Sequence, residues 1–177
     1  MEFSLRPVAT KDIEQVVALS LRAWEPVHAS LARVLGPDIN RHVTPDLRQS
    51  QEAAVRKACA EQLTTVAVQD EAVVGFVSVL IEGPQDPGEI YMLAVDPAAQ
   101  RTGVGRALTD HALSQIRDAG CAVAVVSTGG DPGHAPARAL YEACGFTTEL
   151  RIVNYYRLVE PSQPGSHWSG LTRTATN

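Results

Sequence analysis

The apolar positions of the first sixty residues indicate one strand followed by helices. Residues 3–8 alternate apolar and polar side chains and include Pro7, as a short edge strand does. From Ile13 to Trp24 the apolar residues recur with the helical period, and we expect Pro26 to end this helix. The rest of this part is predicted as a helix at 28–35, a loop at 38–45 and a helix at 46–60.

β-branched residues dominate the middle of the chain and indicate strands there. The runs 63–69 and 72–81 are separated by Asp70 and Glu71, which is typical of a hairpin. After a loop rich in Gly and Pro, residues 89–95 read Glu-Ile-Tyr-Met-Leu-Ala-Val, the pattern of a buried strand.

A helix and a second apolar strand follow this strand. The helix is expected over 103–119, with Gly120 ending it, and the run 121–126 is too continuously apolar for a half-exposed strand. We therefore expect 121–126 to be central and parallel to 89–95, with the helix as a right-handed crossover between them.

The C-terminal part is predicted as a short helix at 135–143, a last strand at 147–159 and a polar stretch at 161–177. The polar stretch has no apolar period, so we expect a disordered tail there. The prediction is one domain over residues 1–160, which suits a chain of 177 residues because domains usually contain about 100–200 residues.

Composition and charge narrow the function classes. The chain is 45% apolar and 20% charged, as globular proteins are, and its net charge of −5 argues against nucleic acid as a partner. Its apolar runs fall far short of the ~20 residues that span a bilayer, so no membrane partner is expected, and the N-terminus lacks the pattern of a secretory signal. Three cysteines without C-x-x-C spacing indicate reduced thiols. We expect a cytoplasmic protein without a metal.

The residues between the strand at 89–95 and the following helix carry the most specific motif, Gln-Arg-Thr-Gly-Val-Gly at 100–105. Successive amides at a helix N-terminus favour phosphate, and Arg101 and Arg106 add positive charge. A P-loop is excluded because no lysine follows the glycines, and a dinucleotide fingerprint is excluded because Leu108 stands in place of its third glycine.

This Q-x-x-G-x-G pattern resembles the acyl-coenzyme A loop of the GCN5-related N-acetyltransferase (GNAT) superfamily. Residues 89–96 resemble the central strand of that family. A later stretch resembles its motif A-x-x-L-Y-x-x-x-G-F, at Ala137, Leu140, Tyr141, Gly145 and Phe146. The resemblance implies an α/β (α+β) fold with a mixed, mostly antiparallel sheet of six to seven strands. Helices would flank this sheet, and a parallel central pair would splay to hold acyl-CoA.

The resemblance also implies that two backbone segments bind acetyl-CoA. The pantetheine arm and thioester carbonyl would lie on Leu93, Ala94 and Val95, and an amide near Leu93, at an expected bulge, would stabilise the oxyanion. The pyrophosphate would be held by Gln100, Arg101, Thr102, Gly103, Val104, Gly105 and Arg106. His134 stands where the family often has an asparagine that caps a helix and touches the cofactor, and an imidazole can also cap or donate a hydrogen bond.

Two catalytic residues follow from the same resemblance. Tyr141 would be the general acid for the departing thiolate, because a tyrosine of pKa about 10 stays protonated at neutral pH; the alternative is a tyrosine that only packs. Glu89 would be the base that deprotonates the amine, since its register relative to Gln100 resembles that of the glutamate in histone-acetylating members. The alternatives are a solvent-facing glutamate, one that binds a cationic substrate, or a chain of waters as the base.

The acceptor is expected to bind near the first helices and the last strand. Trp24, Glu25 and His28 cluster where the first two predicted helices meet, and Tyr155 lies on the predicted last strand. Trp24 and Glu25 would bind a cationic amine through cation–π and charge contacts; alternatively, Trp24 fills the core and Glu25 faces water.

Together these residues predict an acetyl-CoA-dependent N-acetyltransferase. The acetyl group would pass from acetyl-CoA to a primary amine, on a small molecule or peptide, by direct attack in a ternary complex. The alternative is a non-catalytic acyl-CoA-binding sensor or interaction module with the same fold. A homodimer is compatible with the sequence, but nothing in the apolar pattern requires one.

Overall fold

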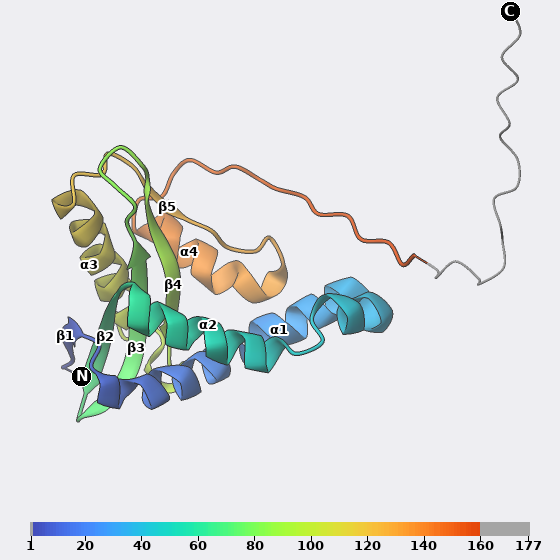
Figure 1. Cartoon of the computed structure of the whole chain (residues 1–177), viewed down its shortest axis with the longest axis horizontal. Helices are drawn as coiled ribbons and strands as arrows, with labels where there is room; N and C mark the ends of the chain where they lie inside the picture. The colour runs from blue at the N-terminus through green and yellow to red at the C-terminus, as the bar shows by residue number, and fades with distance from the viewer. Residues whose placement is uncertain (1, 160–177) are drawn as a thin grey trace, which may run out of the picture.

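The computed structural model describes residues 2–159, which build a sheet of five strands with helices on both faces (Figure 1). The strands are β1 (Ser4–Pro7), β2 (Leu63–Gln69), β3 (Ala72–Leu80), β4 (Gly88–Val95) and β5 (Ala124–Val126). They lie side by side in the order of the sequence. The first four are antiparallel, and β5 runs parallel to β4. The predicted parallel pair is thereby confirmed, but the expectation of a central strand at 121–126 is wrong, since β5 is a short strand at the edge of the sheet.

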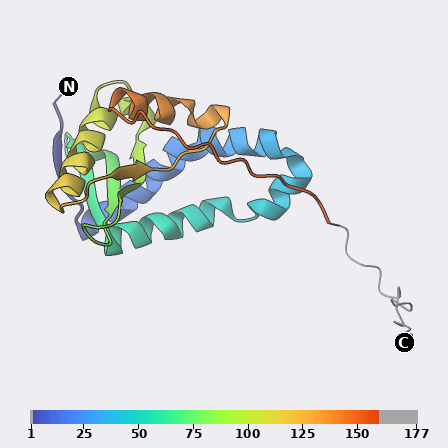
Figure 2. The same cartoon turned by 90° about the horizontal axis from the view of Figure 1, so that it is seen from above.

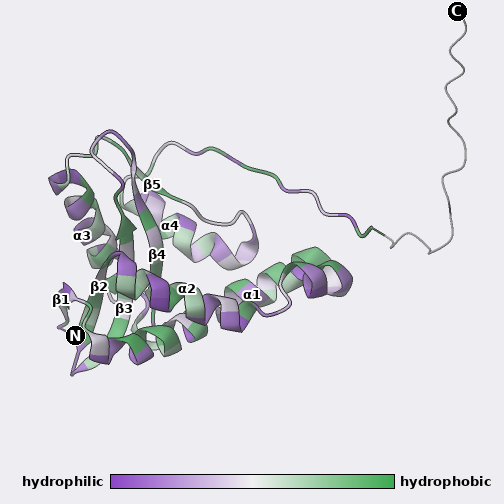
Figure 3. Cartoon of the chain, in the orientation of Figure 1, coloured by the Kyte–Doolittle hydropathy of each residue, from purple (hydrophilic) through white to green (hydrophobic). Residues whose placement is uncertain are grey.

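The helices lie in two layers around this sheet. They are α1 (Ile13–Val43), α2 (Leu47–Glu61), α3 (Val104–Asp118) and α4 (Ala135–Ala143), with short 3-10 turns at Thr10–Asp12, Pro97–Ala99 and Pro132–His134. Helices α1 and α2 cover one face of the sheet and α3 the other, as the view from above shows (Figure 2). The strands are mostly hydrophobic, whereas the helices combine both kinds of residue (Figure 3).

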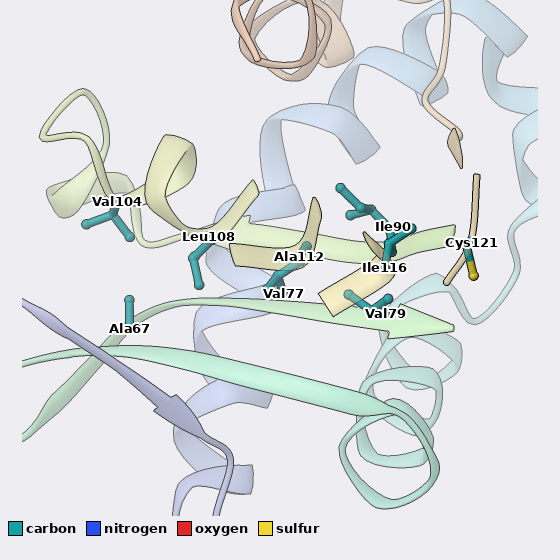
Figure 4. Close-up of a cluster of buried hydrophobic side chains, with 9 residues drawn as sticks. All are labelled: Ala67, Val77, Val79, Ile90, Val104, Leu108, Ala112, Ile116 and Cys121. Carbon is teal, nitrogen blue, oxygen red and sulfur yellow. The ribbon is translucent and has the colours of Figure 1, made fainter. Parts of the chain in front are cut away.

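The apolar stripe of α3 forms the core on its side of the sheet. Val104, Leu108, Ala112 and Ile116 recur with the helical period and point at the strands (Figure 4). Their partners on the strands are Ala67, Val77, Val79 and Ile90. A second cluster, on the α1 and α2 side, includes Val16, Leu19, Val55, Val66 and Phe76. Side chains of this kind each contribute about 1.5–3 kcal/mol when fully buried, so the two clusters hold the three layers together.

A β-bulge in β4 decides which backbone groups face the open side of the sheet. Met92 pairs with Ser78 and Ile90 with Val79, so Tyr91 is an extra residue without a partner on β3. The amide of Gly88 donates to Val123 beside β5, whereas the amide of Asp96 donates to Val74 on β3. Without the bulge both amides would point to the same side.

Beyond this bulge the sheet opens between β4 and β5. The two strands pair at three positions, Gly88 with Ala124, Glu89 with Val125 and Ile90 with Val126. After Val126 the chain leaves the sheet and packs on α1 through the turn Pro132–His134. Within residues 2–159, the C-terminal half of β4 therefore has no strand on one side, which agrees with the splayed pair that the resemblance implies.

The first helix is longer than the sequence predicted. Pro26 does not end it, and α1 continues until Gly36, whose left-handed backbone (φ 74°) interrupts it before a last helical stretch to Val43. Packing holds the helix on both sides of Pro26: Trp24 lies edge-on against Phe76, and Ser30 contacts the turn before α4. The predicted loop at 38–45 is also wrong, since residues up to Val43 are helical.

The predicted last strand at 147–159 does not form, so residues 2–159 contain five strands rather than six or seven. Gly145 turns the chain outward with a φ of 93°, and Phe146 is the last residue that packs on the core. The following segment runs away from the sheet in Figure 1, and Ile152 is 80% exposed. The expected tail at 161–177 lies outside the described residues, as does the predicted domain end at 160.

Candidate active site

Unpaired backbone amides gather where β4 leads into α3. Gly103 precedes the helix with a φ of 93°, and no side chain caps it. Within residues 2–159, no backbone or side-chain group accepts a hydrogen bond from the amides of Val104, Gly105 and Arg106. Such amides carry the positive end of the helix dipole and are satisfied by an anion.

The loop before α3 holds a strained residue, Arg101, whose φ is +64°. A left-handed backbone costs a residue with a side chain about 1–2 kcal/mol. The guanidinium of Arg101 is exposed and has no ion-pair partner in the described part of the chain. Thr102 donates to the carbonyl of Ala99 at 2.6 Å, so its hydroxyl fixes the loop itself.

Two other predicted phosphate ligands are also engaged within the protein. Gln100 donates through Nε2 to the carbonyl of Val95 at 3.3 Å. Arg106 donates to the carbonyl of Ala143 at 3.1 Å and lies 3.6 Å from the carboxylate of Asp110. The side chain of Arg106 therefore joins α3 to the end of α4, whereas Arg101 has no ion-pair partner among the described residues.

The bulge decides the direction of the backbone groups of Leu93, Ala94 and Val95, the three residues of β4 that are predicted to bind the cofactor. Since Asp96 faces β3 and the backbone direction alternates, Leu93 and Val95 turn their amides and carbonyls toward the opening, and Ala94 turns its own toward β3. Leu93 therefore offers a free amide and carbonyl to an extended ligand, whereas Val95 offers only its amide, because its carbonyl accepts from Gln100. For Ala94 the expectation is wrong, because its backbone groups are directed into the sheet.

Tyr141 lies on α4 with its ring buried and its hydroxyl available. The residue is 8% exposed, and its ring packs edge-on against Phe146 with a centroid distance of 5.9 Å. No group in residues 2–159 bonds to the hydroxyl, which nevertheless is not sealed from solvent. Burial, with a smaller contribution from Cys144, raises the pKa of Tyr141 to about 12.

Glu89 lies at the closed end of the opening, where β4 and β5 are still paired. It pairs with Leu80 on β3 and Val125 on β5, one residue before the ladder between β4 and β5 ends. Ile90 packs against α3, so the side chain of Glu89 projects from the opposite face, toward α1 and α2. It is partly exposed and forms no ion pair within the described chain. A free carboxylate at this position can accept a proton or bind a cation.

His134 turns toward its own loop. Its Nδ1 contacts the carboxylate of Asp131, which also accepts from the amide of Gly133 at 2.9 Å. Burial works to raise the pKa of Asp131, but hydrogen bonds from Ser30 and His134 outweigh it and leave the pKa lowered. Burial also lowers the pKa of nearby His28, and the charge of His134 adds to this effect. The imidazole thus organises the start of α4 and does not cap that helix with its side chain.

The structure brings three of the four predicted acceptor residues together on α1 and leaves the fourth apart. Trp24 packs against Phe76, at 6.2 Å between ring centroids, so it belongs to the core. Glu25 and His28 line a groove of about 500 Å³ between α1 and α2. Tyr155 is 94% exposed on the segment that leaves the sheet. Tyr155 therefore does not join the other three residues.

The described residues meet neither the requirements of a metal site nor those of a membrane-spanning helix. Residues 2–159 contain no group of three or more histidine, cysteine, aspartate or glutamate side chains placed to hold a metal ion. None of the helices in this part of the chain is both long enough and apolar enough to cross a bilayer.

Solved structures with the same arrangement of elements are acetyltransferases. PaiA N-acetyltransferase from Thermoplasma acidophilum, in complex with coenzyme A, superposes with a TM-score of 0.62 over 84% of this chain and 92% of its own, at 15% identity. The ribosomal-protein-S18-alanine N-acetyltransferase from Escherichia coli also gives a TM-score of 0.62, over 89% of this chain and 85% of its own, at 22% identity. At these identities the likeness shows the fold.

Sequence relatives match a shorter stretch. Mycothiol acetyltransferase from Beutenbergia cavernae is 53% identical over 60 residues, which are 34% of this chain and 20% of that protein. The mycothiol acetyltransferase from Geodermatophilus obscurus is 41% identical over 76 residues, 43% of this chain and 24% of its own. The match thus spans about a fifth to a quarter of the length of these relatives.

The family assignment rests on a longer match. The profile of the Acetyltransferase (GNAT) family matches residues 29–146, which is more than half of the chain. That range contains the bulged strand β4, the amide-rich start of α3 and Tyr141 on α4. The chain belongs to the GNAT acetyltransferase family.

Proposed function

We propose that the protein transfers an acetyl group from acetyl-CoA to a primary amine by direct attack in a ternary complex. One observation carries this proposal: unpaired amides at the start of α3 adjoin the free main-chain edge of β4. These groups suit a ligand with a pyrophosphate at one end and an amide-containing arm that leads to a thioester. Coenzyme A in the related PaiA structure and the names of the relatives support the same reading.

In this proposal the pyrophosphate binds to the amides of residues 102–106, and the guanidinium of Arg101 pairs with it. The main-chain groups of Leu93 and Val95 bind the amides of the pantetheine arm, which takes the place that β5 leaves open. The amide of Leu93 also supplies a hydrogen bond to the negative charge that develops on the thioester oxygen during attack.

Glu89 is the proposed base. A primary amine of pKa about 10 is almost entirely ammonium at neutral pH, and it must lose a proton before its nitrogen can attack. The free carboxylate of Glu89 at the closed end of the opening takes this proton, directly or through one water. The carbon–nitrogen bond then forms, and the bond between the acyl carbon and sulfur breaks.

Tyr141 is the proposed hydrogen-bond donor to the leaving sulfur. With its pKa raised to about 12, the phenol stays protonated wherever the enzyme works. A complete transfer of its proton to a thiolate of pKa about 8.5 would be uphill, so we assign the hydroxyl to stabilising the developing thiolate. The second proton of the attacking nitrogen finally reaches the sulfur, and the products are an amide and free coenzyme A.

The acceptor is a small molecule or peptide with a cationic amine. Glu25 and His28 in the groove between α1 and α2 are candidate contacts for it, and the net charge of −5 favours a cation. Incubation with acetyl-CoA and a panel of polyamines, aminoglycosides, amino acids and peptide N-termini tests the proposal by mass spectrometry. We expect at least one amine to gain an acetyl group. Binding of acetyl-CoA without any acetylated amine would favour a non-catalytic acyl-CoA sensor.

A further inference from the structure

The opening between β4 and β5 has two walls, which are hydrogen-bonded to each other where the two strands pair. One wall is the C-terminal half of β4 with the loop that leads to α3. The other wall is the loop at 127–134 with α4, which carries Tyr141. Three residue pairs between β4 and β5 join the walls at the closed end. On the α3 side the walls meet again where Gly105 approaches Leu140 and where Arg106 donates to Ala143.

On the opposite side, α1 contacts both walls. Arg22 donates to the carboxylate of Asp96 at 2.6 and 3.1 Å, and Asp96 in turn accepts from the amide of Ala98 at 3.0 Å. This contact fixes the turn between β4 and the loop that we assign to the pyrophosphate. Burial works to raise the pKa of Asp96, but the hydrogen bonds from Arg22 and Ala98 leave it lowered, so the pair is charged at neutral pH.

Ser30 lies eight residues after Arg22 on α1 and contacts the other wall. Its hydroxyl is buried, with the residue 4% exposed, and it accepts from the amide of Gly133 at 3.0 Å. The approach is close enough that a Cβ on Gly133 would lie 2.7 Å from the Cβ of Ser30. The loop is itself rigid, because Asp131 binds Ser30, Gly133 and His134, and Arg138 donates to the carbonyl of Asp131 at 3.0 Å.

Pro26 lies midway between these two contacts. A proline has no amide hydrogen, so the carbonyl of Arg22 loses its usual partner four residues later, and proline bends helices at this point. The eight-residue interval between Arg22 and Ser30 spans about 12 Å along a straight helix.

We propose that α1, through Arg22 and Ser30, sets the width of the opening and so determines how long an acyl group the protein accepts. The inference rests on the proposed function, because it assigns the opening to the acyl-bearing arm of coenzyme A. Arg22 and Ser30 are specificity-determining positioning residues, and neither needs to touch the acyl group. Loss of either contact lets one wall move and leaves more room near the thioester.

Calorimetric titration with acetyl-CoA and butyryl-CoA tests this inference without an acceptor. We expect the wild-type chain to prefer acetyl-CoA, and Arg22→Ala and Ser30→Ala each to reduce that preference about fivefold or more. Arg41→Ala is the matched control, because Arg41 lies on the same helix beyond Gly36 and, among residues 2–159, pairs only with Asp38. Its preference should equal that of the wild type.

Several outcomes would overturn the inference. One is an unchanged preference in both variants with circular dichroism like the wild type, and another is a wild-type chain that binds both thioesters equally. Arg22→Ala keeps the test decisive if Ser30→Ala fails to fold, because the side chain of Arg22 is half-exposed. A wild-type chain that binds no acyl-CoA would instead overturn the proposed function, and this inference with it.

Discussion

Tyr141 combines a buried ring with a hydroxyl that bonds to no group within residues 2–159. The ring packs on Phe146, and burial raises the pKa of Tyr141 to about 12. The hydroxyl is open to solvent, and in the proposed function the sulfur of acetyl-CoA becomes its partner. The same packing would hold the oxygen in one place, which a donor to a leaving group requires.

Replacing Tyr141 by Phe tests this role. The variant keeps the ring and loses the donor, so we expect turnover to fall about a hundredfold while the affinity for acetyl-CoA stays nearly constant. Steady-state kinetics with one acetylated amine and calorimetry with acetyl-CoA measure the two quantities. Tyr155→Phe, at the 94% exposed tyrosine, is the control and should behave as the wild type. Undiminished turnover of Tyr141→Phe over a series of amines would show that the hydroxyl takes no part.

Replacing Glu89 by Gln tests the base. The amide cannot take a proton, so the reaction should depend on the small fraction of neutral amine, and the rate should climb with pH up to the amine pKa of about 10. Rates at saturating acetyl-CoA across this range provide the profile. Glu71→Gln, in the turn between β2 and β3, is a matched control. If Glu89→Gln keeps the wild-type profile, the carboxylate is not the base.

At the scale of elements, the packing of β4 on α3 places the amides and the strand edge together. Gly88 begins β4 directly beneath Ile116, and a Cβ added to Gly88 would lie 2.6 Å from the Cγ2 of Ile116. Gly88→Ala should therefore lower the free energy of unfolding by about 1–3 kcal/mol, since overpacked cores lose this much. Urea denaturation measures the loss.

Gly83→Ala provides the comparison for this substitution. A Cβ at Gly83 would meet only the Asp86 side chain, at 3.7 Å, which is an ordinary contact. Its urea midpoint should stay close to that of the wild type. Equal midpoints for Gly88→Ala and the wild type would show that β4 and α3 are not packed as tightly as described.

Most elements could be predicted because their signals are local. The helical period placed Val104, Leu108, Ala112 and Ile116 on the inner face of α3, where they are buried. Asp70 and Glu71 form the turn between β2 and β3 with φ of 49° and 66°. Pro26 was misjudged because packing on both sides of it, against residues distant in the sequence, outweighs its local preference.

The candidate site could be predicted only where its signal is a local motif. Gln100 to Gly105 marked the amide-rich start of α3, but no local pattern showed the bulge at Tyr91, which decides that Ala94 faces the sheet. The contact of Ser30 with Gly133 joins residues 103 positions apart, so it could be found only in the folded chain. The sequence also gives no sign of the left-handed backbone of Arg101, because arginine seldom adopts this conformation.

At the scale of the whole molecule, a buried ion pair ties the N-terminal strand to the first helix. Arg6 on β1 donates to both oxygens of Asp12, at 2.6 and 2.9 Å, and Asp12 is 2% exposed at the start of α1. The hydrogen bond from Arg6 is the main cause of a lowered pKa at Asp12, and it outweighs the opposing effect of burial. This pair should therefore make stability depend on pH.

The lowered pKa of Asp12 determines whether stability rises or falls with pH. A carboxyl whose folded pKa lies below its unfolded pKa of about 3.9 stabilises the fold fully above that value and loses this effect as pH falls through the folded pKa. Urea midpoints should show the wild type more stable than Asp12→Asn near neutral pH, with a difference that shrinks in acid. Asp38→Asn, in an exposed pair, should track the wild type. A constant difference at all pH values would contradict this account.

The charge of the molecule differs between the whole chain and the start of α3. The chain carries a net charge of −5, yet among residues 2–159 the start of α3 presents unpaired amides and an Arg101 without an ion-pair partner. In the proposed function the polyanionic thioester binds at that local site, and the wider negative field attracts the cationic amine. Coenzyme A binding should therefore depend on the amides far more than on the net charge.

Release of thiol from acetyl-CoA shows whether the chain transfers an acetyl group to an amine. The wild-type chain is mixed with acetyl-CoA, and free thiol is followed over time with and without each amine of the panel. An acetyltransferase should release thiol faster in the presence of at least one amine, and the amount of thiol should equal the amount of acetylated product. Saturable binding of acetyl-CoA with no amine-dependent release for any acceptor would contradict the account.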